Sequence, residues 1–417
     1  MLWSSVYFRH PSASPGSSSD HRRAWVLLDT VAYTDVDEDD DIPQNATTAA
    51  ATASSGATVE VTFALVDPPA VSSWFVRCTG TTTKRKPAQR ASSARVVRAE
   101  GSLLLLRVFN NNSDDFFVYS AGSGKPPSLH LLPGPYPRAL GGCIKLKPPT
   151  EFFSTSYVLH VFSSETERWS SKAAVVDWED EETDYGSVIS HSGGKVVVID
   201  DGGGAGRLVV GWVDLWQGVL TCDVLATDPV MRLIWLPPPC PSNMADQCGG
   251  MGYEVTNAQS CRDVTYSDGC FRFAEIDWDD SASEAAIGWT ATMWKRPISS
   301  SEWSITCTVD PSEITVSGSF SRHLPPELRC GDDEANKMDF HRVMAAAPTL
   351  GLRDDDLLHM MCKLKIDDSK AWVLAIDPEK KKLQAVSLFS AERMRFFEPT
   401  YIPCSFSSYL GTTENHE

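Results

Sequence analysis

Apolar positions along this chain come in short runs rather than in helical stripes. The runs are rich in β-branched, aromatic and leucine residues, and Gly, Pro, Asp or Ser bounds each of them, which is typical of strands joined by tight turns. Such strand–turn–strand units recur over residues 59–78, 115–137, 156–176, 208–239, 286–309 and 370–389. Segments that could form a helix are scarce and are confined to residues 325–347 and 387–397.

The pattern predicts a mostly β protein, a β-propeller-like array of these units with few short helices. A single hairpin cannot bury its own apolar face, so repeated hairpins must pack against one another. At about 40–50 residues for each blade, the chain has room for roughly six or seven blades. The units are unevenly spaced, which leaves two-sheet β-sandwich domains as the alternative.

Changes in composition along the chain separate one long domain from polar tails at its ends and polar insertions within it. We expect a single β-rich domain over residues 24–405, between a disordered N-terminal tail, 1–23, and a C-terminal tail, 406–417. Two polar stretches, 35–58 and 80–95, are expected to be flexible insertions, because they have too little apolar surface to offset the entropy of ordering.

The second of these stretches contains the basic sequence "KRKPAQR" at residues 84–90. Clusters of this kind serve as nuclear import signals and also occur in ordinary solvated loops. The sequence leaves both interpretations open.

The net charge and the cysteines limit the cellular compartments and the classes of partner that we expect. The net charge is −18, which disfavours nucleic acid and anionic membrane surfaces, because both are polyanions. No run approaches the ~18 apolar residues that span a bilayer. Eleven cysteines without a secretory signal fit reduced thiols in the cytoplasm or the nucleus better than an organelle. The expected partners are therefore proteins of unknown identity.

A glycine-rich loop, "DDGGGAGR" at residues 200–207, is the one feature that suggests nucleotide chemistry. A dinucleotide fingerprint needs a third glycine where Arg207 stands, and it must open a helix whose amides bind phosphate. The residues that follow, "LVVGWVDL", alternate like a strand. The loop is therefore predicted to be a hairpin turn.

Four cysteines, Cys240, Cys248, Cys261 and Cys270, are weak candidates for a zinc site. Four thiolates can hold zinc in a tetrahedron, but structural sites usually present pairs two to four residues apart. The spacing here is wider, and we expect ordinary buried or loop thiols without a metal.

Trp212 and Trp216 lie four residues apart in "GWVDLWQG". On an unbroken strand the two rings would share a face with Asp214, because side chains alternate with a period of two. This arrangement would suit an aromatic ligand platform. Burial in a core beside a capped turn, with Asp214 bonded to turn amides, is the interpretation that we favour.

Catalytic motifs are missing from the sequence. It contains neither G-x-S-x-G nor H-E-x-x-H, its histidines are dispersed, and no pair of carboxylates stands out for acid–base work. We therefore expect a protein-interaction or adaptor module without catalysis and without a cofactor. The alternative is a hydrolase or small-molecule-binding protein on a β-propeller scaffold.

The middle of the chain resembles a known family. "GWVDLWQGVLTCDVL" at 211–225 and "PVMRLIWLPPP" at 229–239 are similar to the central signature of a large plant family, expanded in grasses, the domain of unknown function 1618. "RAWVLLDTVAY" and "DDDLLHMMCKLKIDDSKAWVLAIDPEKKKLQAV" agree with the family's flanks. The resemblance covers about residues 24–405 and is most specific over 208–350, which we call the signature segment.

The family has no established catalytic residues, so the resemblance implies none here. Its signature residues are expected to be structural: Gly211, Trp212, Asp214, Trp216, Gly218, Cys222, Asp223, Pro237 and Pro238. The strand units also resemble, more distantly, the β-propeller repeats associated with F-boxes in plant ubiquitin-ligase adaptors. No F-box-like helical segment is expected before them.

Overall fold

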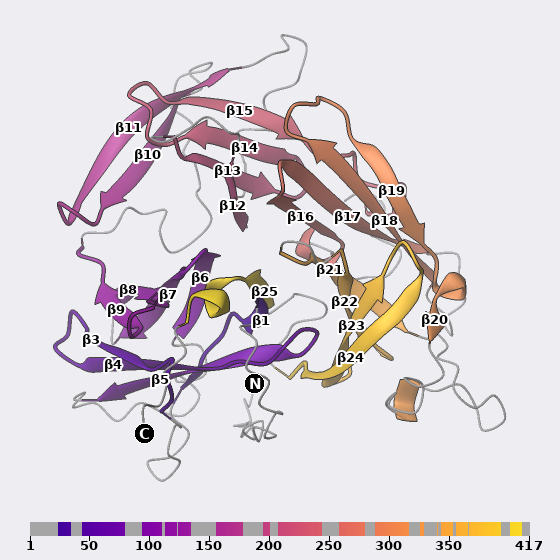
Figure 1. Cartoon of the computed structure of the whole chain (residues 1–417), viewed down its shortest axis with the longest axis horizontal. Coiled ribbons are helices and arrows are strands. Elements are labelled where there is room, and N and C mark those ends of the chain that lie inside the picture. Colours follow the sequence, from indigo (N-terminus) through magenta and orange to yellow (C-terminus); the bar gives the residue numbers. More distant parts are fainter. Residues whose placement is uncertain are drawn as a thin grey trace, which may run out of the picture. The chain divides into compact units, whose positions relative to one another are not determined.

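The structure, a computed structural model, describes the β-rich parts of the chain (Figure 1). The described residues are 24–34, 44–79, 94–110, 113–122, 124–134, 156–177, 195–200, 207–243, 258–279, 288–316, 326–328, 340, 343–352, 356–365, 367–392 and 401–410. The expected N-terminal tail, the "KRKPAQR" sequence, Cys248 and the glycines at 202–206 lie outside them.

The chain forms two compact units. Unit 1 comprises residues 1–134 and 400–417, and it contains two sheets. Sheet 1 has the order β25 (Tyr401–Cys404), β1 (Val26–Asp29), β5 (Val71–Thr79), β4 (Thr58–Ala64), β3 (Ala49–Thr52), with β2 (Tyr33–Thr34) against β5. Sheet 2 has the order β6 (Ala94–Glu100), β7 (Leu103–Asn110), β8 (Ser113–Ser120), β9 (Ser128–Leu131).

Unit 2 comprises residues 135–399 and contains three sheets. Sheet 3 has the order β10 (Ser156–Ser163), β11 (Arg168–Asp177), β15 (Val230–Trp235), β14 (Gly218–Asp223), β13 (Val209–Asp214), β12 (Lys195–Ile199). Sheet 4 runs β16 (Arg262–Ser267), β17 (Cys270–Asp279), β18 (Gly288–Pro297), β19 (Ser304–Val309). Sheet 5 runs β20 (Thr315–Val316), β24 (Lys382–Ser390), β23 (Lys370–Asp377), β22 (Leu358–Lys363), β21 (Met344–Leu350).

The predicted fold class is confirmed: the chain is mostly β, an array of small meandering sheets of the kind that make propeller blades. The described residues form five sheets rather than the six or seven blades expected, because two sheets hold six strands each. Unit 2 alone contains three sheets, so the two-sheet sandwich does not describe it.

Helical structure is limited, among the described residues, to 3₁₀ turns of three or four residues. Within the first helical segment, 325–347, the described residues form the turn Pro326–Leu328 and the start of strand β21, and strand β24 extends through Ser390 in the second expected helix. No described segment forms a helix with the length and apolarity to cross a bilayer.

Sheet 1 is built from both ends of the chain. Strand β25 pairs antiparallel with β1, with Val26 opposite Cys404. The residue Phe406, just beyond β25, is fully buried and packs against the rings of Phe63 and Tyr119. Residues 406–410 are therefore part of the core of unit 1, which differs from the tail expected from residue 406 onward.

The expected flexible insertion also differs from the structure in its second half. Residues 44–58 form a turn and strand β3, which pairs antiparallel with β4. The side chain of Asn45 accepts a hydrogen bond from the Thr47 amide at 2.7 Å, and Thr47 Oγ1 accepts one from the Phe63 amide at 2.8 Å. Polar side chains thus replace the apolar burial that the composition lacks. The acidic residues 35–43 lie outside the described part.

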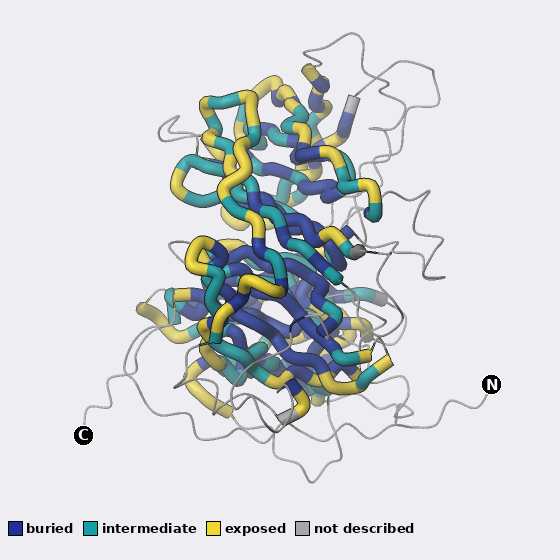
Figure 2. The backbone as a smooth tube through the Cα atoms, turned by 90° about the vertical axis from the view of Figure 1, so that its right-hand side faces the viewer, coloured by how far each residue is buried: buried dark blue, intermediate teal, exposed yellow. Residues whose placement is uncertain are grey.

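Unit 2 buries both faces of its central sheet. On β17, Phe271 and Phe273 pack toward sheet 3, whereas Ala274 and Ile276 pack toward sheet 5. This alternation follows from the period of two along a strand. In Figure 2 the buried residues accordingly run along the strands, and exposed residues gather at turns and outer edges.

Sheet 3 carries more strands than an ordinary blade. Strands β12, β13, β14 and β15 form an antiparallel meander of four, the usual content of a propeller blade. The β10–β11 hairpin is added beyond it, because β11 pairs in parallel with β15 over Val175–Asp177 (Figure 1). Strand β10 is therefore the outer edge of the enlarged sheet.

Candidate functional site

Seven of the nine signature residues lie on the β13–β14 hairpin of sheet 3, and Pro237 and Pro238 follow β15. The chain leaves β13 at Asp214 and turns through Leu215, Trp216 and Gln217 before β14 begins at Gly218. The carboxylate of Asp214 accepts a hydrogen bond from the Trp216 amide at 2.9 Å, and its carbonyl accepts one from the Gln217 amide at 3.1 Å. A carboxylate that bonds a turn amide in this way fixes the turn. The expectation that Asp214 bonds turn amides is confirmed.

The two tryptophans of the signature do not form a common platform. Trp212, on β13, packs against a cluster that includes Tyr157 and Met231. Trp216, in the turn, packs with the cluster of Val264 and Phe273 on the other face of the sheet. The shared face that their spacing implies would require an unbroken strand, and the chain turns immediately after Asp214.

Two signature glycines are required by close packing. A Cβ atom on Gly211 would lie 2.7 Å from Val219 Cγ1 and 2.9 Å from Val197 Cγ2. A Cβ atom on Gly218 would lie 2.5 Å from the carbonyl oxygen of Ile234. Both glycines therefore let neighbouring strands approach more closely than any side chain would allow.

The glycine loop at 202–206 is flanked by paired strands. Strands β12 and β13 on either side of it pair antiparallel, with Ile199 opposite Val209. Antiparallel neighbours joined by a short connection make a hairpin. The strand that follows the loop excludes the helix that a dinucleotide fingerprint needs.

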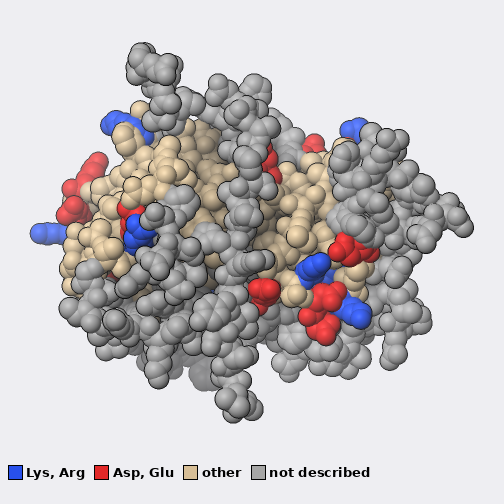
Figure 3. All heavy atoms as spheres, turned by 90° about the horizontal axis from the view of Figure 1, so that it is seen from below, with Lys and Arg blue, Asp and Glu red and all other residues tan. Residues whose placement is uncertain are grey.

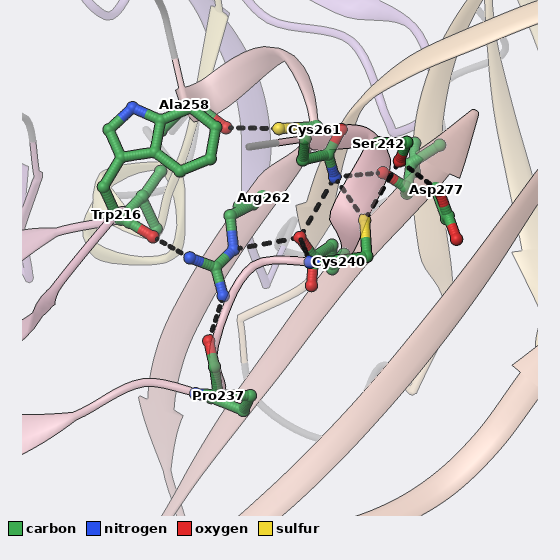
Figure 4. Close-up of polar contacts among 12 residues, drawn as sticks. Trp216, Pro237, Cys240, Ser242, Ala258, Cys261, Arg262 and Asp277 are labelled. Carbon is green, nitrogen blue, oxygen red and sulfur yellow. Dashed lines mark hydrogen bonds and ion pairs between the residues drawn. The ribbon is translucent and has the colours of Figure 1, made fainter. Parts of the chain in front are cut away.

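Among the described residues of unit 2, the most buried charged one is Arg262, at the start of β16 in sheet 4 (Figure 4). Its Nη1 donates to the carbonyl of Leu215 at 2.6 Å, and its Nη2 donates to the carbonyl of Pro237. The guanidinium lies 4.7 Å from the ring centroid of Phe273 and 5.9 Å from that of Trp216. Arg262 thus joins sheet 4 to the turn and to the proline segment of the signature.

An acidic partner balances this cation. Glu275, buried on β17, places Oε1 at 3.5 Å from Nε of Arg262. The same oxygen accepts hydrogen bonds from the Cys240 amide at 3.1 Å and from Asn243 Nδ2 at 3.0 Å. Figure 4 shows these contacts converging between the start of β16 and the loop after β15. We call Arg262, Glu275, Asn243 and Cys240 the arginine network.

A second ion pair follows directly along β16. Asp263 accepts a hydrogen bond from Lys195 Nζ on β12 at 2.7 Å and one from the Leu350 amide on β21 at 3.0 Å. Consecutive residues on a strand point to opposite faces. Arg262 and Asp263 therefore tie the first strand of sheet 4 to both neighbouring sheets.

Burial shifts the pKa values of several ionisable groups in unit 2. Burial, together with the nearby Glu275 and Asp277 carboxylates, raises the pKa of the Cys240 thiol to about 12, so the thiol stays protonated at neutral pH. Burial lowers the pKa of Arg262, and Glu275 opposes this shift. Burial also lowers the pKa of His359 to about 4, so its imidazole is neutral.

The described zinc candidates do not come together in one site. Cys240 lies after β15, where its sulfur contacts Ser242 Oγ at 3.3 Å, Cys261 precedes β16 and Cys270 begins β17. No group of three or more potential ligands occurs among the residues described. The eight described cysteines are thiols rather than disulfides.

The remaining signature residues also make structural contacts. Burial raises the pKa of Cys222. Although burial acts in the opposite direction, the amides of Leu208 and Leu225 hold the pKa of Asp223 below its usual value, with help from Arg207 at 3.3 Å. Pro237 is buried with its carbonyl on Arg262, whereas Pro238 is exposed.

Sequence reasoning missed Arg262, Glu275 and Asn243. A signal for two of them exists in "CRDVTYSDGCFRFAEID": Arg262 shares a strand face with Val264, and Glu275 shares one with Phe273. A charged residue at a position where the alternation requires an apolar one indicates a buried ion pair. Asn243 lies in a turn whose position the pattern does not fix.

Residues 212–359 match the model of the family described as "Protein of unknown function (DUF1618)". The match begins at Trp212, within the hairpin, and ends at His359. No curated protein matches the chain.

Two solved structures align with parts of the chain. Xylan beta-1,4-xylosidase from Bacillus halodurans C-125 is 12% identical over 49% of this chain, with a TM-score of 0.22, and the chain spans only 32% of its length. The Nup133 β-propeller domain of Vanderwaltozyma polyspora is 6% identical over 85% of this chain and 76% of its own, with a TM-score of 0.25. At these TM-scores neither likeness bears on function.

Proposed function

We propose that this chain is a non-catalytic protein-interaction module, an adaptor whose signature segment builds the scaffold and whose exposed side chains on sheet 3 bind the partner. The arginine network uses its polar groups to hold sheets 3 and 4 together. The signature thus serves packing, and the binding surface must be sought among exposed side chains.

One observation carries the proposal: exposed valines lie side by side across three strands of sheet 3. Val158 on β10 is 52% exposed, Val175 on β11 is 61% exposed and Val230 on β15 is 40% exposed. Val175 stands opposite Val230 in the register, and Val158 stands opposite Ala173 on the same face of β11. We call Val158, Ala173, Val175 and Val230 the valine face.

Contiguous exposed apolar side chains usually mark an interaction site, whereas single ones do not. The charges support a protein as the partner rather than nucleic acid, since the chain carries −18 overall. On the face of the molecule in Figure 3, described acidic and basic side chains lie close together instead of forming a basic patch.

The test is affinity purification of the full chain from its native tissue, followed by mass spectrometry and binding of the purified partner. A Val175→Asp variant should lose the partner, because it places a charge on the valine face. A Leu388→Asp variant, which changes an equally exposed residue of sheet 5, is the matched control. A small molecule that co-purifies while no protein depends on Val175 would contradict the proposal.

A further inference from the structure

Among the edges of the described sheets, the outer edge of β10 is the one whose strand has none of the usual protective features in its own length, sequence or register. Edge strands usually avoid unwanted pairing by being short, by carrying charged residues or proline, or by bulging away from a regular register. Strand β10 is eight residues long, "SYVLHVFS", with no Asp, Glu, Lys, Arg or Pro. Its register against β11 runs from Ser156 to Ser163 without a shift.

Every other terminal strand of the described sheets carries at least one of these protections. Four strands have only two to four residues: β3, β9, β20 and β25. Three contain charged residues: β6, β12 and β16. Two have a register shift against their neighbours: β19 and β21. Strand β10 is therefore the edge with which a further strand can pair most readily.

We infer that an extended segment of a partner protein adds to sheet 3 as a further strand along β10, with its side chains against the valine face. This inference rests on the proposed function and specifies its mode of binding. In strand addition the main chain supplies the hydrogen bonds, and alternate side chains supply the specificity. Alternate residues of the added strand would lie beside Val158, at the spacing of neighbouring strands.

The size of the edge favours an extended segment over a second copy of this chain. Eight residues of strand span about 26 Å, and a contact about 10 Å deep along them covers about 260 Å² on each partner. Stable interfaces between folded proteins bury about 800 Å² on each partner. A flexible segment that binds transiently needs no larger surface.

The acidic charge near β10 indicates which residues should flank the paired stretch of the added segment. The turn between β10 and β11 exposes Glu165 and Glu167, and the whole chain carries −18. The added segment should therefore alternate β-branched and polar residues and carry Lys or Arg beside the stretch that pairs. Basic flanks would raise the association rate and make binding weaken as salt increases.

The experiment selects a displayed library of random nine-residue peptides on the full chain. Enriched peptides should alternate apolar and polar residues with basic flanks, and Val158→Lys should weaken their binding about tenfold or more, because a lysine on an edge strand opposes pairing. Synthetic copies of these peptides can be N-methylated at alternate backbone amides, so that they keep their side chains and lose those N–H donors. Copies methylated on the amides that face β10 should bind about tenfold more weakly. Leu388→Lys is the control and should change nothing.

Three results would overturn the inference. The library could enrich no sequence that depends on Val158, the N-methylated copies could bind as tightly as their parents, or light scattering could show a dimer that Val158→Lys dissociates. The last result would assign the edge to a second copy. If the native partner still binds the Val158→Lys chain but not the Val175→Asp chain, strand addition fails and the proposed function stands. If no partner binds either the parent chain or its variants, both fail.

Discussion

The guanidinium of Arg262 donates a hydrogen bond to the carbonyl of Leu215, 2.6 Å away, and thereby joins the first strand of sheet 4 to the β13–β14 turn of sheet 3. Leu215 lies between Asp214, which fixes the turn, and Trp216, whose ring faces the guanidinium. Two signature residues thus contact one buried cation: the ring of Trp216 faces the guanidinium of Arg262, and the carbonyl of Pro237 accepts a hydrogen bond from it.

Replacing Arg262 by methionine should lower the free energy of unfolding by about 3 kcal/mol or more, because it leaves the buried carboxylate of Glu275 without its cation. Urea unfolding followed by tryptophan fluorescence measures the change. Arg232→Met is the control, since Arg232 forms an exposed ion pair with Asp177 and its loss should cost about 0–1 kcal/mol. Equal effects of the two substitutions would show that the arginine network does not stabilise the fold.

Gly211→Ala should destabilise the chain by about 1–3 kcal/mol, because the new methyl group overlaps Val219 and Val197. The double variant Gly211→Ala/Val219→Ala should regain part of this loss relative to the sum of the single changes, since it removes the Cγ1 atom 2.7 Å away. Gly218→Ala should cost more than Gly211→Ala, because its nearest neighbour is the backbone carbonyl of Ile234. Additive single effects in the double variant would contradict the packing argument.

Lowering the pH should decrease the free energy of unfolding, because His359 is buried in its neutral form. Burial lowers its folded pKa to about 4 from the ordinary value of 6.5, so the unfolded chain binds more protons between these values. Stability is therefore complete above about pH 6.5 and falls as the pH drops toward 4, by about 3 kcal/mol in all. Thermal unfolding from pH 4 to pH 7 measures this slope, and His359→Gln should flatten it. An unchanged slope in the variant would assign the dependence to other groups.

The Cys240 thiol should resist alkylation. Its pKa of about 12 leaves almost no thiolate at pH 8, and thiolate is the reactive form. Iodoacetamide followed by peptide mass spectrometry should find Cys240 unmodified in the folded chain and modified after unfolding in urea. Labelling of folded Cys240 at the rate of a small free thiol would show that the site is open and reactive.

Much of the architecture follows from local pattern. The alternation in "LVVGWVDLWQGVLTCDVL" and the turn residue Asp214 are sufficient to predict β13, β14 and the turn between them. The close approach at Gly211 also depends on Val197, which lies on β12 outside this segment, so it could not be predicted from the segment alone.

The arginine network could be predicted only in part. Arg262 interrupts an alternating apolar pattern, which indicates a buried charge, but its acceptors are backbone carbonyls at Leu215 and Pro237, and any residue supplies a carbonyl. The core role of Phe406 was missed for a different reason. It packs with Phe63 because the two ends of the chain share sheet 1, and only tertiary structure shows this pairing.

The decisive measurement is the affinity of the purified native partner for the Val175→Asp chain, compared with the parent chain and with the Leu388→Asp control. We predict that Val175→Asp weakens binding about tenfold or more while its thermal unfolding stays unchanged, since Val175 is exposed and lies on the valine face. Leu388→Asp should bind like the parent. Equal affinity of all three chains would contradict the claim that this protein binds its partner through the valine face of sheet 3.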